Sequence, residues 1–277
     1  MSLPDTFFDA SQRRHTIHSL SQNTITMQKK DITASIQKSI ETGERTPLSH
    51  FDSRKYIQHN LMLEDGLGAI FQFMDSLPKG RTEVTVACAF EDGDYSVALA
   101  EYLLGDWGRM VGFEVHRWEN GKIVEHWDNL QPLRGPNPSG RSMVDGTFFS
   151  AAARGTQDCK RLVTDFVETV LIGRDAGSAS RFFDRDNLAQ HAPRHGDGVD
   201  AFVQGLVSND AATAHLTLHK VLGEGALVLA IIEGTQDGKP TSFYHLFRIE
   251  RGLIAEHWEV IEPILPREQW KNSNGKF

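Results

Sequence analysis

The sequence has few cysteines, no excess of basic residues and no long apolar run, and each lack excludes a class of protein. Cys88 and Cys159 are the only cysteines among 277 residues, which excludes a disulfide framework and a paired-cysteine metal motif. The formal net charge of -8 argues against a surface that follows nucleic-acid phosphates. No stretch has the length of a membrane span or a signal-peptide core, so we expect a cytoplasmic protein without membrane or nucleic-acid partners.

The chain contains an internal repeat. The segment YIQHNLMLEDGLGAIFQFM, which begins at Tyr56, matches LAQHAPRHGDGVDAFVQGL, which begins at Leu188, 132 positions later. The segment ENGKIVEHWDNLQP from Glu119 matches ERGLIAEHWEVIEP from Glu250, at an offset of 131. Two matches in the same order at nearly the same offset indicate a duplication of one domain.

We expect the boundary between the two copies in the stretch RGPNPSGRSMVDG, residues 134–146. Its prolines and glycines stop helices and strands, and its polar residues cannot form a core. The predicted organisation is an N-terminal tail over residues 1–27, a first domain over 28–134, a linker over 135–155 and a second domain over 156–277.

Within each copy the spacing of apolar residues changes from helical to strand-like. Helical spacing comes first and predicts a long opening helix and a shorter second helix. Alternating, β-branched segments follow and predict two hairpins, so the whole is an α+β fold. The expected elements of the two copies are an opening helix at 32–40 and 162–171, a short helix at 66–74 and 198–206, and a final hairpin turning at Asn120-Gly121 and Arg251-Gly252.

This order of elements, with the motifs YIQHN and FEVHRWENGKIVEHWD, resembles the SnoaL-like branch of the NTF2-like superfamily over nearly all of both halves. The resemblance implies that each copy is a cone, with a curved antiparallel sheet wrapped around a long N-terminal helix and a mainly apolar pocket. The branch includes polyketide cyclases that close rings by aldol condensation without metal or organic cofactor, so no cofactor is expected. It also implies an intramolecular pseudo-dimer, in which the copies pair through the outer faces of their sheets.

The final hairpin of each copy carries candidate acid–base groups. Removing a proton next to a carbonyl needs a carboxylate or imidazole in a partly dry pocket, and a hydrogen-bond donor for the enolate oxygen. Because alternate residues of a strand share a face, His126 and Asp128 point to one side of the sheet and Trp127 to the other.

The turn of this hairpin decides whether Glu114, on the preceding strand, joins that polar face. A two-residue turn at Asn120-Gly121 would place Glu114 opposite Trp127. A type I turn with a bulge at Gly121 would place it opposite His126. We favour the bulge, because it gathers the polar side chains on one face.

The resemblance assigns roles to these positions. In the cyclases an Asp of the last strand is the acid/base and a His of the preceding strand shares its pocket. The Asp position falls on Asp128 and Glu259, and the His position on Glu114 and His245. Like-charge repulsion between Glu114 and Asp128 would raise the pKa of one carboxyl, whereas a protonated His245 would oppose a rise at Glu259. The candidate catalytic residues are Asp128, Glu114 and His126 in the first copy and Glu259, His245 and His257 in the second.

Other repeated residues are candidates for ligand contact, and each also has a structural interpretation. An imidazole before a loop caps backbone groups, a strand histidine satisfies a buried network, and a strand tryptophan packs on the sheet. His116 and His195 have no matched partner and are interpreted as surface or structural. The candidate ligand-binding residues are His59, His191, Tyr56, Trp127 and Trp258.

Two functions remain open at this point. A metal site is also conceivable, but we do not predict one. His191, His245, His257 and Glu259 could together hold zinc or iron, but their spacing matches no compact metal motif. We expect a small-molecule pocket protein, namely a lyase or isomerase that uses carboxylate and histidine acid–base chemistry on an apolar or carbonyl-containing compound. The alternative is a non-catalytic binder of a small ligand, or one catalytic copy with a structural twin.

Overall fold

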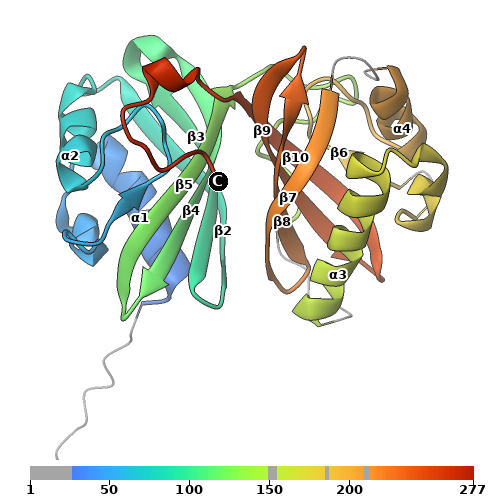
Figure 1. Ribbon diagram of the computed structural model, residues 1–277, viewed down its shortest axis with the longest axis horizontal. Helices are drawn as coiled ribbons and strands as arrows, with labels where there is room; N and C mark the ends of the chain where they lie inside the picture. Colours follow the sequence, from blue (N-terminus) through green and yellow to red (C-terminus); the bar gives the residue numbers. More distant parts are fainter. Residues whose placement is uncertain (1–26, 149–154, 185–186, 209–212) are drawn as a thin grey trace, which may run out of the picture.

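The computed structural model describes residues 27–148, 155–184, 187–208 and 213–277. These residues form two similar α+β units, each a curved five-stranded sheet with helices on one face (Figure 1). The two tandem cones predicted from the sequence are thereby confirmed. Residues 1–26 of the expected tail, and residues 149–154 of the expected linker, lie outside the described residues.

The first unit starts with a helix that ends at Gly43, whose left-handed φ of 72° lets its N–H bind the Ser39 carbonyl. None of the helices in the described ranges is both long and apolar enough to cross a bilayer. The elements of this unit are α1 Lys29–Thr42, a 3-10 turn Thr46–His50, β1 Ile57–Gln58, α2 Leu67–Ser76, β2 Thr82–Asp92, β3 Tyr95–Leu104, a 3-10 turn Gly105–Trp107, β4 Arg109–Glu119 and β5 Lys122–Pro132.

The second unit repeats this order. Its elements are α3 Thr156–Phe166, a π-helical continuation Val167–Ile172, a 3-10 turn Ala176–Arg181, β6 Ala189–Gln190, α4 Val199–Ser208, β7 Thr213–Glu224, β8 Leu227–Gln236, β9 Lys239–Glu250, β10 Leu253–Pro263 and a 3-10 turn Arg267–Gln269. The strand orders are β1-β5-β4-β3-β2 and β6-β10-β9-β8-β7. The short first strand of each unit is parallel to its neighbour, and the other pairings are antiparallel.

The last hairpin of the first unit corrects the expected register. Asn120 and Gly121 both have positive φ, 50° and 74°, so the turn is a two-residue turn of the type I′ kind rather than a type I turn. The register shifts at Val124, which has no partner in β4. Glu114 therefore lies opposite Asp128 and not opposite His126, although all three still share one face.

The two sheets pack against each other through the faces that the helices leave free (Figure 1). Alternation along each strand sends one set of side chains to this contact and the other set to the interior of the cone. In β4, Phe113 and Val115 join the contact while Glu114 faces the interior. The apolar core of the contact includes Leu99, Phe113 and Trp127 of the first unit and Leu229, Tyr244 and Trp258 of the second.

Ion pairs between the units repeat the same symmetry. Lys30 of α1 lies 2.6 Å from the Glu224 carboxylate at the end of β7, and Lys160 of α3 pairs with Asp92 at the end of β2. Each carboxylate also accepts a backbone N–H from the other unit, Asp92 from Gly223 and Glu224 from Glu91. Both lysines and both carboxylates occupy corresponding places in the repeat.

The segment after each unit crosses to the other unit. Residues 135–148 cover the second unit, and residues 264–277, red in Figure 1, run back across the first. The Ser142 carbonyl lies 2.8 Å from Nδ1 of His191, and the Gly275 carbonyl lies 2.9 Å from Nδ1 of His59. The linker was expected to form no core, but its Met143 is buried between the sheets.

Candidate functional site

Strands β4 and β5 bring the candidate groups of the first unit to the interior of its cone. Glu114 lies opposite Asp128 and His116 opposite His126, so the register shift described above places four polar side chains side by side. All four are buried. The intervening Trp127 points away from them to the contact between the sheets.

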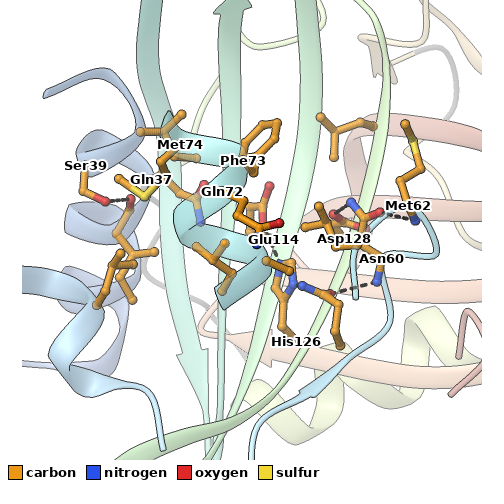
Figure 2. Close-up of a pocket in the computed structure, with 18 of the residues that line it drawn as sticks. Gln37, Ser39, Asn60, Met62, Gln72, Phe73, Met74, Glu114, His126 and Asp128 are labelled. Carbon is orange, nitrogen blue, oxygen red and sulfur yellow. Dashed lines mark hydrogen bonds and ion pairs between the residues drawn. The ribbon is translucent and has the colours of Figure 1, made fainter. Parts of the chain in front are cut away.

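The central pair of the site is His126 and Glu114. Nε2 of His126 lies 2.7 Å from Oε2 of Glu114, and Nδ1 lies 2.8 Å from Oε1 of Gln58 (Figure 2). The backbone N–H of Asn60 donates to the same Gln58 oxygen, which identifies it as the carbonyl end of the amide. Nδ1 of His126 therefore carries a proton, and a second proton is shared between Nε2 and the Glu114 carboxyl.

Asp128 has separate partners. Nδ2 of Asn60 donates to its Oδ2 at 2.5 Å. The Lys276 ammonium, from the C-terminal segment, lies 3.4 Å from its Oδ1 and 2.7 Å from Glu262. Lys276 and Asp128 are each 4% exposed at the side chain, so this ammonium compensates a carboxylate that is almost dry.

The first unit holds its protons in a defined pattern. Burial raises the pKa of Glu114, although the hydrogen bond with His126 acts against the rise. Burial lowers the pKa of His126, but the hydrogen bond with Glu114 and the charges of Glu114 and Asp128 outweigh it, and the result is a raised pKa. Burial and the charge of His126 lower the pKa of His116 well below its ordinary value. The two raised pKa values favour keeping the proton that the Glu114–His126 pair shares, while His116 is a neutral imidazole near pH 7.

Tyr102 completes the polar end of the site from β3. Its hydroxyl lies 3.0 Å from Oε1 of Glu114 and 3.0 Å from Oε1 of Gln37, and it donates to one of them at a time. Burial raises the pKa of Tyr102 well above its ordinary value, so the hydroxyl keeps its proton.

These groups lie at one end of a cavity of about 460 Å³ (Figure 2). This volume suits a small organic molecule. The rest of the wall is mainly apolar and comes from α1, α2 and the strands, with Ile36, Ile40, Ile70, Phe73, Met74 and Leu104 among its residues.

In the described part of the second unit, aromatic rings pack in the corresponding interior. Phe166, at the position of Ile36, has its ring centroid within 5.3 to 5.8 Å of four other phenylalanine rings. Phe247 occupies the position of His116 and Phe202 that of Ile70. The repeat has therefore kept the fold in both units, while bulkier aromatic side chains stand in the second unit at positions that line the cavity in the first.

Glu259, His245 and His257 of the second unit also converge, with His245 opposite Glu259. Burial raises the pKa of Glu259 to about 7, opposed by the charge of Arg194. Burial lowers the pKa of His257 to about 3 and that of His245 well below its ordinary value. The expectation of a protonated His245 is therefore wrong, because an imidazole in this dry interior is neutral near pH 7.

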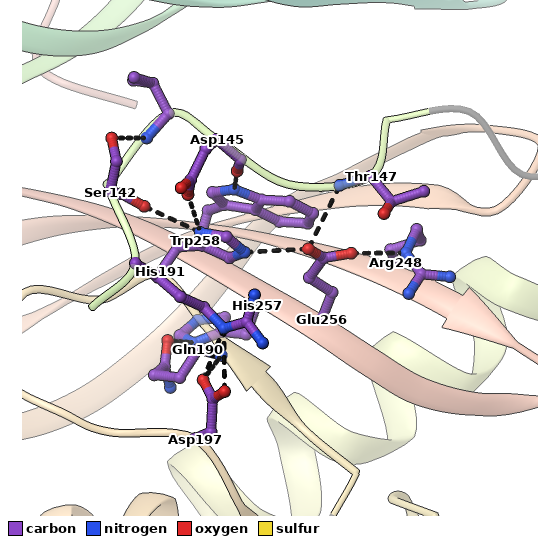
Figure 3. Close-up of polar contacts among 12 residues, drawn as sticks. Ser142, Asp145, Thr147, Gln190, His191, Asp197, Arg248, Glu256, His257 and Trp258 are labelled. Atoms are coloured by element: carbon purple, nitrogen blue, oxygen red, sulfur yellow. Dashed lines mark hydrogen bonds and ion pairs between the residues drawn. The ribbon is translucent and has the colours of Figure 1, made fainter. Parts of the chain in front are cut away.

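The structure places four of the five candidate ligand-binding residues outside the cavity. His59 stacks on Trp127 with ring centroids 4.7 Å apart, and His191 stacks in the same way on Trp258. Figure 3 shows His191 held between Ser142 and Glu256. These histidines fix the crossing segments to the sheets, and His191 does not join the other three residues of the metal alternative. Of the five, Tyr56 lines the cavity.

Several groups of the site were not anticipated from the sequence. Lys276 comes from a segment outside the repeat, 148 positions from Asp128, and nothing local signals their contact. His116, interpreted as surface or structural, lines the cavity. The alternation of side chains along a strand could have indicated Tyr102. It shares a face of β3 with Ala98, which pairs with Glu114.

Comparison with known proteins concerns the fold. No protein-family model and no curated protein matches the chain. Solved structures similar to one unit include an NTF2-like protein of unknown function from Cytophaga hutchinsonii, with 20% identity over 40% of this chain and 94% of that chain and a TM-score of 0.34. A putative ketosteroid isomerase from Kribbella flavida has 14% identity over 41% and 87% of the two chains, with a TM-score of 0.34. A SnoaL-like polyketide cyclase from Agrobacterium tumefaciens has 11% identity over 38% and 91%, with a TM-score of 0.32. These are the kinds of protein that the sequence motifs resemble, and they assign no activity to this chain.

Proposed function

We propose that the first unit is a cofactor-independent lyase or isomerase that moves a proton on a small, mainly apolar carbonyl compound. The observation that carries this proposal is the cavity of about 460 Å³ in which Asp128 and the Glu114–His126 pair occupy the same end. A concave, mainly apolar pocket with a few convergent polar groups is the usual setting of such chemistry.

The roles follow from the charges of these groups. Asp128 is the proposed base, and its carboxylate takes the proton from the carbon next to the substrate carbonyl. The Glu114–His126 pair holds a proton that it donates to the carbonyl oxygen as the enolate forms. Returning the proton from Asp128 to another carbon would complete an isomerisation. Attack of the enolate on a second carbonyl would instead form a C–C bond.

The walls limit the substrate to a small apolar body with one polar end. Ile36, Ile70 and Met74 line the part of the cavity that faces the helices, beside the neutral amides of Gln37 and Gln72, so the helices supply no charged partner there. A ring or short chain with a carbonyl would bury its apolar part there and direct the carbonyl to the polar end.

The second unit is proposed to act as the structural partner in an intramolecular pseudo-dimer. The shared apolar core and the two symmetric ion pairs, Lys30–Glu224 and Lys160–Asp92, support this assembly. The second unit also supplies the crossing segment that brings Lys276 to Asp128. A site that depends on both units gives the second unit a role in the function proposed for the first.

The proposal is tested by hydrogen exchange. The full chain is incubated in D₂O with a panel of small cyclic ketones, enones and 1,3-dicarbonyl compounds, and deuterium uptake next to the carbonyl is followed by NMR. We expect at least one compound to exchange much faster with the protein than with buffer. If compounds bind, as measured by calorimetry, and none exchanges, the protein is the non-catalytic ligand binder.

A further inference from the structure

A second polar cluster lies on β9 and β10 of the second unit. Nδ1 of His245 is 2.9 Å from Nε2 of His257 and 3.9 Å from Oε2 of Glu259. One ligand atom from each residue lies within 4.8 Å of the other two. Zinc bonds to histidine nitrogen and carboxylate oxygen are about 2.0–2.2 Å long, which holds ligand atoms roughly 3 to 4 Å apart. Two of the three spacings, 2.9 and 3.9 Å, are near this range, and the third is within 4.8 Å.

The hydrogen-bond partners of His257 fix which of its nitrogens has a free lone pair. The backbone N–H of Ala192 donates to Oε1 of Gln190, so this atom is the amide carbonyl. The same oxygen lies 2.9 Å from Nδ1 of His257, which therefore carries the ring proton (Figure 3). The lone pair of the neutral ring is then on Nε2, directed at His245. Metal-binding histidines are usually held in this way by a partner on the other nitrogen.

His245 has the same kind of support. Its Nε2 lies 3.1 Å from Nε2 of His215, which is also buried. When Nδ1 of His245 binds a cation, its proton is carried on Nε2 and is donated to His215. Both imidazoles of the cluster thus have an outer partner that keeps one nitrogen free for a ligand bond.

Comparison with the first unit shows which charge is lacking. In the first unit the residue after Gly275, whose carbonyl binds His59, is Lys276, and it gives Asp128 a buried cation. In the second unit the residue after Ser142, whose carbonyl binds His191, is Met143. Glu259 stands at the position of Asp128, and Met143 stands at the position of Lys276. The second unit therefore has a methionine where the first has the ammonium that compensates its carboxylate.

Within the described ranges the Glu259 carboxylate accepts no hydrogen bond and forms no ion pair with Arg194. Its side chain is only 11% exposed, so water compensates it little. A carboxylate in such a position is unfavourable unless a cation compensates it. The trio Glu114, His126 and Asp128 of the first unit also converges, but there Lys276 already supplies the positive charge.

We propose that His245, His257 and Glu259 form a binding site for a divalent transition-metal ion of the zinc type. Two imidazoles and one carboxylate are a ligand set of catalytic zinc sites and of the facial triad of iron, and they leave one or more positions for water. Magnesium and calcium prefer sites made of oxygen ligands only and are not expected to bind. This site is independent of the acid–base function proposed for the first unit.

The test uses the full chain after treatment with a chelator. Zinc is added, free metal is removed by gel filtration, and the bound metal is counted by mass spectrometry. We expect about one zinc per chain, no retained magnesium, and visible absorption bands of a four- or five-coordinate ion when cobalt replaces zinc. Retention of less than about a tenth of a zinc per chain, or a cobalt spectrum of the free aqueous ion, would overturn the proposal without any variant being needed.

Variants then locate the ion. Glu259→Gln and His245→Asn keep nearly the same shape but each removes a metal ligand. Losing only a residue that hydrogen-bonds to a ligand typically lowers metal affinity about 10–100-fold, so each variant should lower zinc affinity by at least that much. His219→Gln, which removes an imidazole 26% exposed at the surface, and Asp128→Asn, which alters the trio of the first unit, should bind zinc as the unmodified chain does. Equal zinc binding by His245→Asn and the unmodified chain would place the ion elsewhere and overturn the assignment.

Discussion

Nε2 of His126 lies 2.7 Å from Oε2 of Glu114 in the interior of the first unit. Because Gln58 fixes a proton on the other nitrogen of the ring, the proton between the two atoms is shared by the pair, and we propose that the pair passes it to a ligand. Asp128, next to this pair, has its own compensating cation in Lys276. The Glu114–His126 pair and Asp128, each with its own partners, therefore share one cavity, and this arrangement leads to the following predictions.

Lys276→Met should destabilise the chain strongly, because it leaves the buried Asp128 and the half-buried Glu262 near each other without a cation. Breaking a buried ion pair costs about 3–5 kcal/mol, which corresponds to a fall in melting temperature of roughly 6 °C or more for a chain of this size. The double variant Lys276→Met/Glu262→Gln should recover part of this loss, since it removes one of the two unpaired charges. Thermal unfolding at pH 7 checks both; a single variant as stable as the unmodified chain would show that the ammonium does not compensate these carboxylates.

Ile36→Phe should close the cavity. Phenylalanine occupies the corresponding position in the second unit, as Phe166, where its ring packs against other phenylalanine rings. The larger ring should enter the open space and abolish ligand binding without touching an acid–base group. The free energy of unfolding should fall by no more than the roughly 1–3 kcal/mol that overpacking a filled core costs. Calorimetry with a ligand from the exchange panel measures the loss. Ile57→Phe, at a position 36% exposed on β1, is the control and should bind normally.

His116→Phe should make the chain less sensitive to acid. His116 is 1% exposed, its Nδ1 lies 3.1 Å from the Thr33 hydroxyl, and its ring stacks 5.1 Å from that of His126. Its folded-state pKa lies well below the ordinary 6.5, so its contribution to stability is present above pH 6.5 and is lost as the pH falls and the unfolded chain takes up a proton.

The stability of His116→Phe relative to the unmodified chain should therefore rise by about 2 kcal/mol between pH 7 and pH 5, at 1.36 kcal/mol per pH unit below 6.5. Denaturant unfolding at the two pH values measures this difference. A difference that stays constant, or that shrinks toward pH 5, would mean that His116 is charged in the folded chain.

The features that follow from local patterns could be predicted from the sequence. The duplication, the α+β order and the separation of Trp127 from His126 and Asp128 depend on matched letters and on the two-residue period of a strand. The register was predicted less well. The face of Glu114 was right because one extra residue was expected in the hairpin, but that residue is Val124 rather than one at the turn.

The rest depends on contacts between distant segments. Lys276 reaches Asp128 because the segment after each unit crosses to the other, and no local pattern indicates such a crossing. His59 was a candidate ligand contact because it is repeated, but its repetition reflects the equivalent stacking on Trp127. Repetition in both copies marks what the fold needs, whereas the cavity depends on residues such as Ile36 at which the copies differ.

The central claim is that Asp128 removes a proton from a carbonyl compound in the first unit. The most direct measurement is the rate of deuterium exchange into the best compound of the panel, in the presence of a chelator, for Asp128→Asn and for the matched variant Glu259→Gln of the second unit. We predict that Asp128→Asn lowers the rate by about 100-fold or more with ligand affinity nearly unchanged, and that Glu259→Gln leaves the rate within about twofold. Equal rates for Asp128→Asn and the unmodified chain would contradict the account.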